Sequence, residues 1–272
     1  MVISVKAFFH EKPPKERRKN ELMSSLPVPK AVAKMAIPSV ISSLVTVVYN
    51  MADTFFVGQT GDPLQVAAVS LTNPIFILFM AFANMFGMDG SAAASMAMGG
   101  KNEKRMKQAS AFATYASLIV GVALAVILMV FMMPVLNMFR ANEQTFLYAK
   151  GYTFHIAYGA PFIIWSAAAS FVVRAEGASK EAMIGSMIGT VANIVSDPVL
   201  ISGMGMGAAG AAVATTIGNI LASIYYLWYF LKKSKYFSIS IQYFTCKDGI
   251  LSGVCDQQHF VGCFMEGNQK TD

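Results

Sequence analysis

Long apolar runs alternate with short polar connections along most of the chain. A bilayer core requires about 20 consecutive apolar residues for each spanning helix. The pattern predicts six spanning helices, at residues 35–58, 64–90, 109–133, 148–173, 182–202 and 207–231. Glycine, asparagine, aspartate and proline mark the connections as turns. We therefore expect an all-α, polytopic membrane protein whose body, residues 35–231, is one six-helix bundle.

The composition supports a membrane protein. The 272 residues are 55% hydrophobic and only 13% charged, and the mean hydropathy is +0.52. Soluble domains carry roughly 25% charged residues, so a soluble protein of this composition could not cover its surface with polar groups. All three cysteines, Cys246, Cys255 and Cys263, follow the last span. A disulfide framework within the bundle is therefore excluded.

Lysine and arginine are distributed asymmetrically between the two sides of the predicted bundle. They crowd residues 1–34, the second and fourth connections and the segment after the sixth span, whereas the opposite side has Arg140 and Lys150. The positive-inside rule places the N-terminus in the cytoplasm of a multi-pass protein of the cell membrane. The net charge of +6 does not indicate nucleic-acid binding, because the basic residues are dispersed between apolar runs.

Residues 232–272 depart from the pattern. We expect a cytoplasmic linker followed by an atypical tail that is a truncated or frame-altered end, interrupted near Val254. Cys246, Cys255, His259 and Cys263 lack the paired short spacing of structural zinc sites, so no metal is expected there. No catalytic motif, phosphate-binding loop or cofactor motif is visible in the sequence. An enzyme or a resident cofactor is therefore not expected.

Three aspartates lie within the predicted spans, where an ionised side chain costs at least about 2.5 kcal/mol. Asp89 is near Gly90 at the end of the second span, where we expect it to cap the helix or reach the interface. Asp53 and Asp197 each lie five residues before the outer end of their helix, about 7 Å inside the boundary at 1.5 Å per residue. Two acids at one depth on different helices predict a shared site.

Polar neighbours share the depth or the helix face of these two acids. Tyr49 precedes Asp53 by four residues, and Asn193 precedes Asp197 by four, which places each pair on one face. Carboxylate, amide and hydroxyl oxygens bind a proton or Na⁺. The alternative for the asparagine and the threonines is hydrogen bonding between helices. The predicted cation-coupling site consists of Tyr49, Asp53, Tyr152, Asn193, Asp197, Thr215 and Thr216.

Four segments in this order resemble one family. They are VYNMADTFFVG at 48–58, GSAAAS at 90–95, RAEG at 174–177 and NIVSDPVLI at 193–201. The series is similar to the N-terminal half of the multidrug and toxic compound extrusion (MATE) transporters, over roughly residues 35–244. The resemblance implies two six-helix bundles around a central cavity, and export of cationic, amphipathic compounds in exchange for Na⁺ or H⁺. It also implies coupling residues at Asp53, Asn193, Asp197, Thr215 or Thr216, and Tyr152.

The family has twelve spans, and this chain has six predicted ones. The expected partners are therefore the lipid bilayer, small organic cations, Na⁺ or H⁺, and either a second six-helix bundle or a second copy of the chain in its place. A flippase of lipid-linked precursors has a similar architecture and is the first alternative function. The second alternative is a membrane fragment that does not transport.

Overall fold

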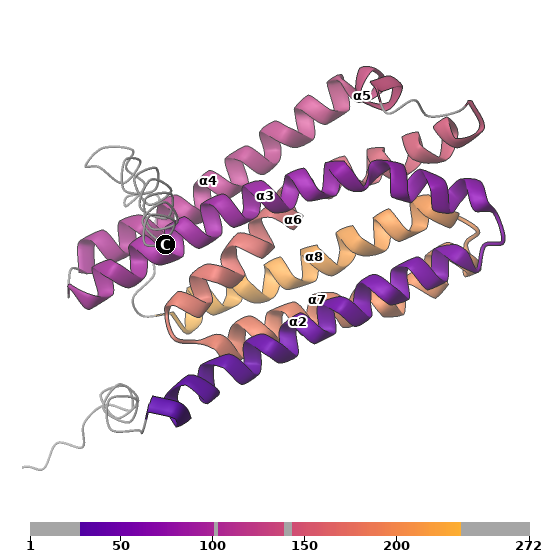
Figure 1. Ribbon diagram of the computed structural model, residues 1–272. Helices are drawn as coiled ribbons and strands as arrows, with labels where there is room; N and C mark the ends of the chain where they lie inside the picture. The colour runs from indigo at the N-terminus through magenta and orange to yellow at the C-terminus, as the bar shows by residue number, and fades with distance from the viewer. Residues whose placement is uncertain (1–27, 101–102, 139–142, 235–272) are drawn as a thin grey trace, which may run out of the picture.

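A computed structural model describes residues 28–100, 103–138 and 143–234 (Figure 1). These residues form helices joined by turns: α2 (Val28–Gly58), α3 (Pro63–Gly99), α4 (Glu103–Val130), α5 (Met132–Met138), α6 (Glu143–Ala175), α7 (Ser179–Asp197), the π-helix η1 (Pro198–Gly203) and α8 (Gly207–Lys232). Within this part of the chain, six helical segments are long and apolar enough to cross a membrane. The predicted number of spans is confirmed. Most of the basic segment 1–34 and most of the linker and tail lie outside the described residues.

The bundle is organised around α6. This helix packs against α3, α4 and α8, while α2 packs mainly against α7, and α7 packs against α8 (Figure 1). The fully buried side chains of Phe79, Ile156, Ile163 and Ile164 belong to the largest apolar cluster of the described bundle. As a result, α8 lies between α6 and α7, and α2 covers another side of α7.

Short turns bring the helix ends together at both ends of the bundle. At one end, called here the Gly61 end, Asp62 caps α3 by accepting a hydrogen bond from the Leu64 amide at 2.9 Å, and Gly61 has a φ of +70°. Gln65 at this end accepts a hydrogen bond from the Ala208 amide at 2.9 Å, which ties α3 to the start of α8. The opposite end, called the Gly177 end, contains the α6–α7 turn and the end of α8.

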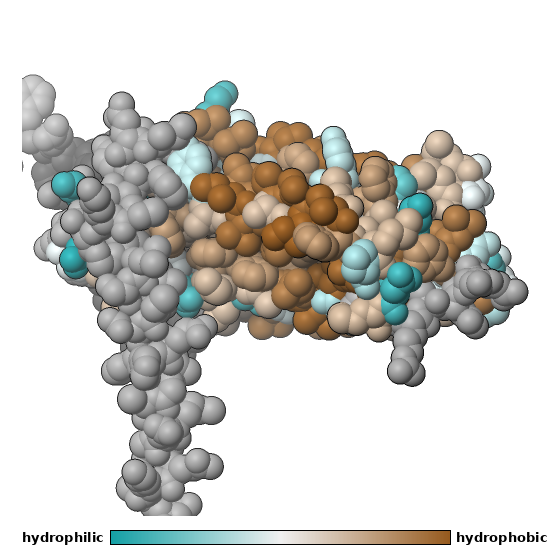
Figure 2. Space-filling view, turned by 90° about the horizontal axis from the view of Figure 1, so that it is seen from above, coloured by the Kyte–Doolittle hydropathy of each residue, from teal (hydrophilic) through white to brown (hydrophobic). Residues whose placement is uncertain are grey.

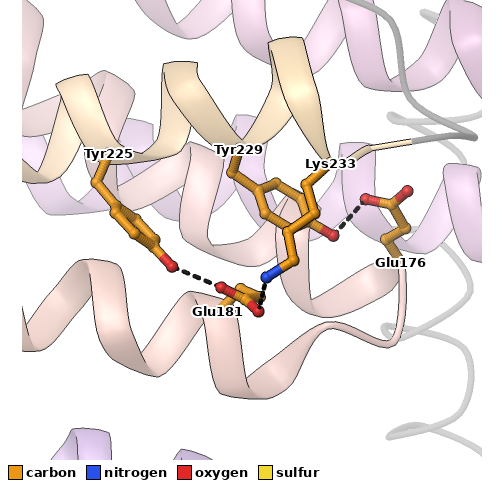
Figure 3. A network of polar contacts seen from close by, with 5 residues as sticks. All are labelled: Glu176, Glu181, Tyr225, Tyr229 and Lys233. Atoms are coloured by element: carbon orange, nitrogen blue, oxygen red, sulfur yellow. Dashed lines mark hydrogen bonds and ion pairs between the residues drawn. The ribbon is translucent and has the colours of Figure 1, made fainter.

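Glutamates of α6–α7 join α8 at the Gly177 end (Figure 3). The Tyr229 hydroxyl donates a hydrogen bond to Glu176 at 2.9 Å, and the Ser234 hydroxyl donates to the other oxygen of Glu176 at 3.0 Å. Glu181 accepts a hydrogen bond from Tyr225 and forms an ion pair with Lys233. This network fixes the last turn of α8 against the connection between α6 and α7.

Several helix boundaries differ from the sequence prediction, and two of these differences change its interpretation. The helix expected at 109–133 breaks after Val130, because the ring of Pro134 clashes with the carbonyl of that residue in a continuous helix. The helix expected to end near Gly90 continues to Gly99. Asp89 is therefore inside α3 and half-buried, and the expectation that it caps the helix is wrong.

The α7 segment changes its winding immediately after Asp197. Pro198 has no amide hydrogen to continue the α-helical pattern, and the chain forms the π-helix η1. A bond from the Met204 amide to the Val199 carbonyl at 2.9 Å closes this wider turn. Single π-turns inside helices are frequent at functional sites, and this one follows one of the two predicted coupling acids.

The surface of the bundle is apolar where a membrane would contact it. Figure 2 shows hydrophobic residues across the middle of the described surface and hydrophilic residues toward its two ends. Exposed side chains on α2, α4 and α7 include Leu44, Val48, Val126, Val191 and Val195. Such an apolar surface is stable in contact with lipid tails and unfavourable in contact with water.

Candidate cation site

The C-terminal half of α7 carries two polar side chains into the interior of the bundle. Asp197 is 0% exposed and Asn193 is 2% exposed, and both occupy the face of α7 that turns away from the exposed Val191 and Val195. The close approach of α7 to α8 begins one turn earlier, where a Cβ on Gly189 would lie 2.9 Å from the carbonyl oxygen of Gly218. Gly185, on the same face of α7, likewise leaves no room for a Cβ, which would lie 2.3 Å from the ring of Tyr226 on α8.

The hydroxyl of Thr215 joins three helices. Asn193 on α7 donates a hydrogen bond from Nδ2 to Thr215 Oγ1 on α8 at 3.3 Å. The hydroxyl of Tyr49 on α2 lies 3.2 Å from the same oxygen. Three of the residues predicted from the sequence are thus directly connected, although they are separated by more than 20 positions in the chain.

The two acids predicted to share a site lie within electrostatic range of each other. Asp53 on α2 and Asp197 on α7 interact through their charges. Tyr152 on α6 is buried and within electrostatic range of both acids and of Tyr49. Tyr152 lies in the third turn of α6, because this helix begins at Glu143, five residues before the start of the predicted span at residue 148.

Four buried oxygen atoms of this group have no hydrogen-bond donor among the residues that the structure describes. They are Oδ1 of Asp53, Oδ1 of Asn193 and both carboxylate oxygens of Asp197. A buried carboxylate without a donor or a cation is strongly destabilising. The donor set is therefore chemically suited to a proton or a small hard cation, whose ligands are carboxylate, amide and hydroxyl oxygens.

Thr216 does not join this group. Its hydroxyl donates hydrogen bonds to the carbonyl oxygens of Ala212 at 2.9 Å and His155 at 3.4 Å. It faces α6, where it packs against Gly159. Of the two threonines between which the sequence left the choice open, the structure joins Thr215 to Asn193 and Tyr49 and turns Thr216 toward α6.

Asn219 and Ser166 extend the polar group and were missed from the sequence. Asn219 donates a hydrogen bond to the carbonyl of Thr215 at 2.8 Å, and Ser166 on α6 donates to Asn219 Oδ1 at 2.8 Å. Asn219 follows Thr215 by four residues, and this spacing on one helix face was a usable signal. Ser166 had no such signal, because its partner is 53 positions away.

A cavity of about 230 Å³, which is partly open to the outside of the bundle, adjoins the group between the helices. Tyr49, Asn193 and Thr215 line it at the side of the acids. Its walls continue toward the Gly177 end along α6, α7 and α8 with Ser166, Ser170, Arg174, Ser186, Asn219 and Tyr226. The cavity is smaller than the roughly 300–1,000 Å³ typical of pockets for drug-sized ligands.

Known proteins share both the sequence and the fold of this chain. The sequence profile of the MatE family matches residues 38–199. The Multidrug export protein MepA of Staphylococcus saprophyticus is 32% identical over 214 residues, which are 79% of this chain and 48% of that protein. The protein of the same name from Staphylococcus aureus is 30% identical over 216 residues, again 79% of this chain and 48% of the relative. The chain thus spans about half the length of these curated relatives.

Solved structures give the same result. An outward-facing multidrug resistance MATE family transporter of the MOP superfamily superposes with a TM-score of 0.78 at 27% identity, over 83% of this chain and 50% of that one. A crystal structure of MATE in the straight conformation gives the same TM-score, identity and coverage. These coverages are those expected for one of two six-helix bundles. The chain, a helical membrane protein, is a member of the MATE family.

Proposed function

We propose that this chain is the cation-coupling half of an antiporter that exports cationic, amphipathic compounds across the cell membrane in exchange for Na⁺ or H⁺. The relatives named multidrug export proteins support the transport class. The observation that carries the coupling role is the set of four buried oxygens of Asp53, Asn193 and Asp197 without a donor in the described structure. The proposal includes the orientation given by the positive-inside rule. The N-terminus is cytoplasmic, and the Gly61 end, which follows the first span, faces the outside of the cell.

Neutralisation of the two aspartates is the proposed driving event. A bound Na⁺ or proton removes the repulsion between Asp53 and Asp197 and the cost of burying their charges. The same Asn193, Thr215 and Tyr49 that surround the acids also line the interior cavity. A cation that reorders these three side chains therefore changes the wall that a transported compound meets.

Coupling between the two ligands must be reciprocal. If a bound cation weakens the binding of the exported compound, that compound weakens cation binding by the same factor. Each ligand shifts the conformational equilibrium only by its difference in affinity for the two states. Competition of this kind would let an inward cation gradient drive the compound outward.

The test is efflux of a cationic dye from cells or vesicles with Na⁺ and proton gradients imposed separately. The protein is the full chain, tested alone and together with a second six-helix bundle of a relative. Asp53→Asn and Asp197→Asn are expected to abolish gradient-driven efflux while the protein is still produced. Asp89→Asn is the matched control, because Asp89 is a half-buried acid of α3 that has no part in the group around Thr215.

Unchanged efflux in both aspartate variants would contradict the coupling role. Loss of efflux in Asp89→Asn to the same extent would show that any charge lost from the bundle has this effect. The comparison of the two gradients decides between Na⁺ and H⁺. Efflux that requires the added bundle would identify a second six-helix unit as the partner of this chain, whereas efflux by the chain alone would favour a pair of identical copies.

A further inference from the structure

The interior cavity continues from the cation site toward the Gly177 end. Ser166 and Arg174 on α6 both line it, and they are eight residues apart, which is about 12 Å along a helix. Ser186 and Asn193 on α7 line it over a similar length. The cavity therefore extends over about 12 Å along the helices of a single bundle, from the level of the cation site to the last turn of α6.

The walls of this cavity are suited to water. Nine of the residues that line it carry hydroxyl groups and two carry amides. They are Ser42, Thr46, Tyr49, Ser166, Ser170, Ser186, Thr190, Thr215 and Tyr226, with Asn193 and Asn219. At about 30 Å³ for each water, its volume holds about seven molecules. A polar cavity with several hydrogen-bonding partners for each water is expected to be hydrated, and small cations cross water more easily than lipid.

Arg174 brings a positive charge to the far end of this path. Its side chain is half-buried, lies on the cavity wall and is within electrostatic range of Tyr226. The guanidinium carbon of Arg174 lies 5.6 Å from the centre of the Phe171 ring. Among the described residues, the ion pair at this end joins Lys233 and Glu181 and does not include Arg174. Glu176 and Glu181 are engaged by groups of α8 (Figure 3).

We infer that Arg174 is an electrostatic barrier, which prevents the coupling cation from passing between the cation site and the Gly177 end through the interior of this bundle. The inference rests on the proposed function. An antiporter loses its coupling if the cation can cross without the exported compound, because the gradient is then dissipated. A fixed guanidinium about 5 Å from the path lowers the local concentration of a monovalent cation by roughly a hundredfold at an effective dielectric constant of about 20.

The first experiment measures cation leak in the absence of any exported compound. The full chain is reconstituted in lipid vesicles, and the influx of Na⁺ or of protons is followed with a trapped indicator dye. Arg174→Ala is expected to raise the leak by about tenfold or more, and Arg174→Lys, which keeps the charge, is expected to leak like the parent protein. Lys180→Ala is the matched control, because Lys180 is an exposed cation at the same end that does not line the cavity.

A leak in Arg174→Ala equal to that of the parent protein would overturn the inference. An equal rise in Lys180→Ala would also overturn it, since the effect would then come from the charge of this membrane surface and not from the cavity. The outcome is separable from that of the proposed function. Aspartate variants that retain efflux refute cation coupling, whereas the leak of Arg174→Ala is measured without efflux.

A second measurement reports the charge of the cavity without ion transport. Ser170 lines the cavity one helical turn from Arg174, and Ser170→Cys is made in a chain whose three cysteines are replaced by serine. Anionic and cationic methanethiosulfonate reagents of similar size are then compared. The anionic reagent is expected to react faster while Arg174 is present, and the preference is expected to be lost in Arg174→Ala. An unchanged preference would overturn the inference even if that variant transports poorly.

Discussion

Gly189 on α7 and Gly218 on α8 face each other so closely that a Cβ on Gly218 would lie 2.5 Å from the carbonyl oxygen of Gly189. Small residues permit this approach of two helices in a membrane. The same Cβ would lie 3.2 Å from the Cβ of Asn193. The contact therefore sets the distance at which Asn193 reaches Thr215, and the packing of two glycines determines the geometry of the candidate cation site.

Gly218→Ala is expected to lower the free energy of unfolding by about 1–3 kcal/mol, because the added methyl group meets backbone atoms that cannot move aside. Thermal unfolding in detergent measures this change. Gly151→Ala is the matched control on α6, where the new Cβ would make an ordinary contact with Ala209 at 3.7 Å. This control is expected to be neutral or to stabilise by up to about 1 kcal/mol. Equal effects of the two substitutions would contradict the role assigned to the α7–α8 contact.

Thr215→Val and Thr216→Val form a nearly isosteric pair that separates the two threonines. Thr215→Val removes the hydroxyl contacted by Asn193 and Tyr49 and is expected to weaken cation binding by roughly 2- to 10-fold, the equivalent of one hydrogen bond. Thr216→Val is expected to leave cation affinity unchanged, because its hydroxyl bonds to backbone carbonyls of Ala212 and His155. Cation-dependent thermal stabilisation measures both affinities, and a larger effect at Thr216 would refute the assignment.

Protons and Na⁺ are expected to compete for the site formed by Asp53 and Asp197. A carboxylate must lose its proton before it can bind a metal cation, so the apparent affinity for Na⁺ is expected to fall as the pH falls. The decrease approaches about tenfold for each pH unit where one proton is exchanged for one Na⁺. Titration of the protein with NaCl at several pH values, with choline chloride as the ionic-strength control, measures this dependence. Asp197→Asn is expected to flatten it, and an equally steep dependence in that variant would exclude Asp197 as the competing group.

Glu176 and Lys233 are expected to differ in their contributions to stability. Glu176→Ala leaves the Tyr229 hydroxyl without the partner it has in the structure and is expected to cost about 1–3 kcal/mol. Lys233→Ala removes an ion pair whose lysine side chain is 51% exposed, and pairs at such positions contribute less than about 1 kcal/mol. Thermal unfolding of both variants in the same detergent tests the order. A larger loss for Lys233→Ala would indicate that the ion pair, and not the tyrosine contact, anchors α8.

Hydropathy was sufficient to predict the number of spans, because lipid requires a continuous apolar helix at each crossing. It was less informative about helix ends. The predicted end of the second span at Gly90 was too early, because the small and polar residues that follow still continue α3 to Gly99. The break after Val130 was not predicted, because Pro134 interrupts the helix without ending the apolar run. Asp89 was misplaced for this reason, since its position relative to the end of α3 depended on a boundary that hydropathy does not define.

The sequence by itself determined which residues were candidates. Acids are costly within a span, so Asp53 and Asp197 stood out, and the four-residue spacing placed Tyr49 and Asn193 on the same faces. Only the tertiary structure decided which of these side chains meet. Consecutive residues point about 100° apart around a helix, so the choice between Thr215 and Thr216 depends on how α8 is rotated against α7. That rotation is set by contacts such as Gly189 with Gly218, and the same packing encloses Ser166, Asn219 and Arg174 around a cavity that no local pattern could reveal.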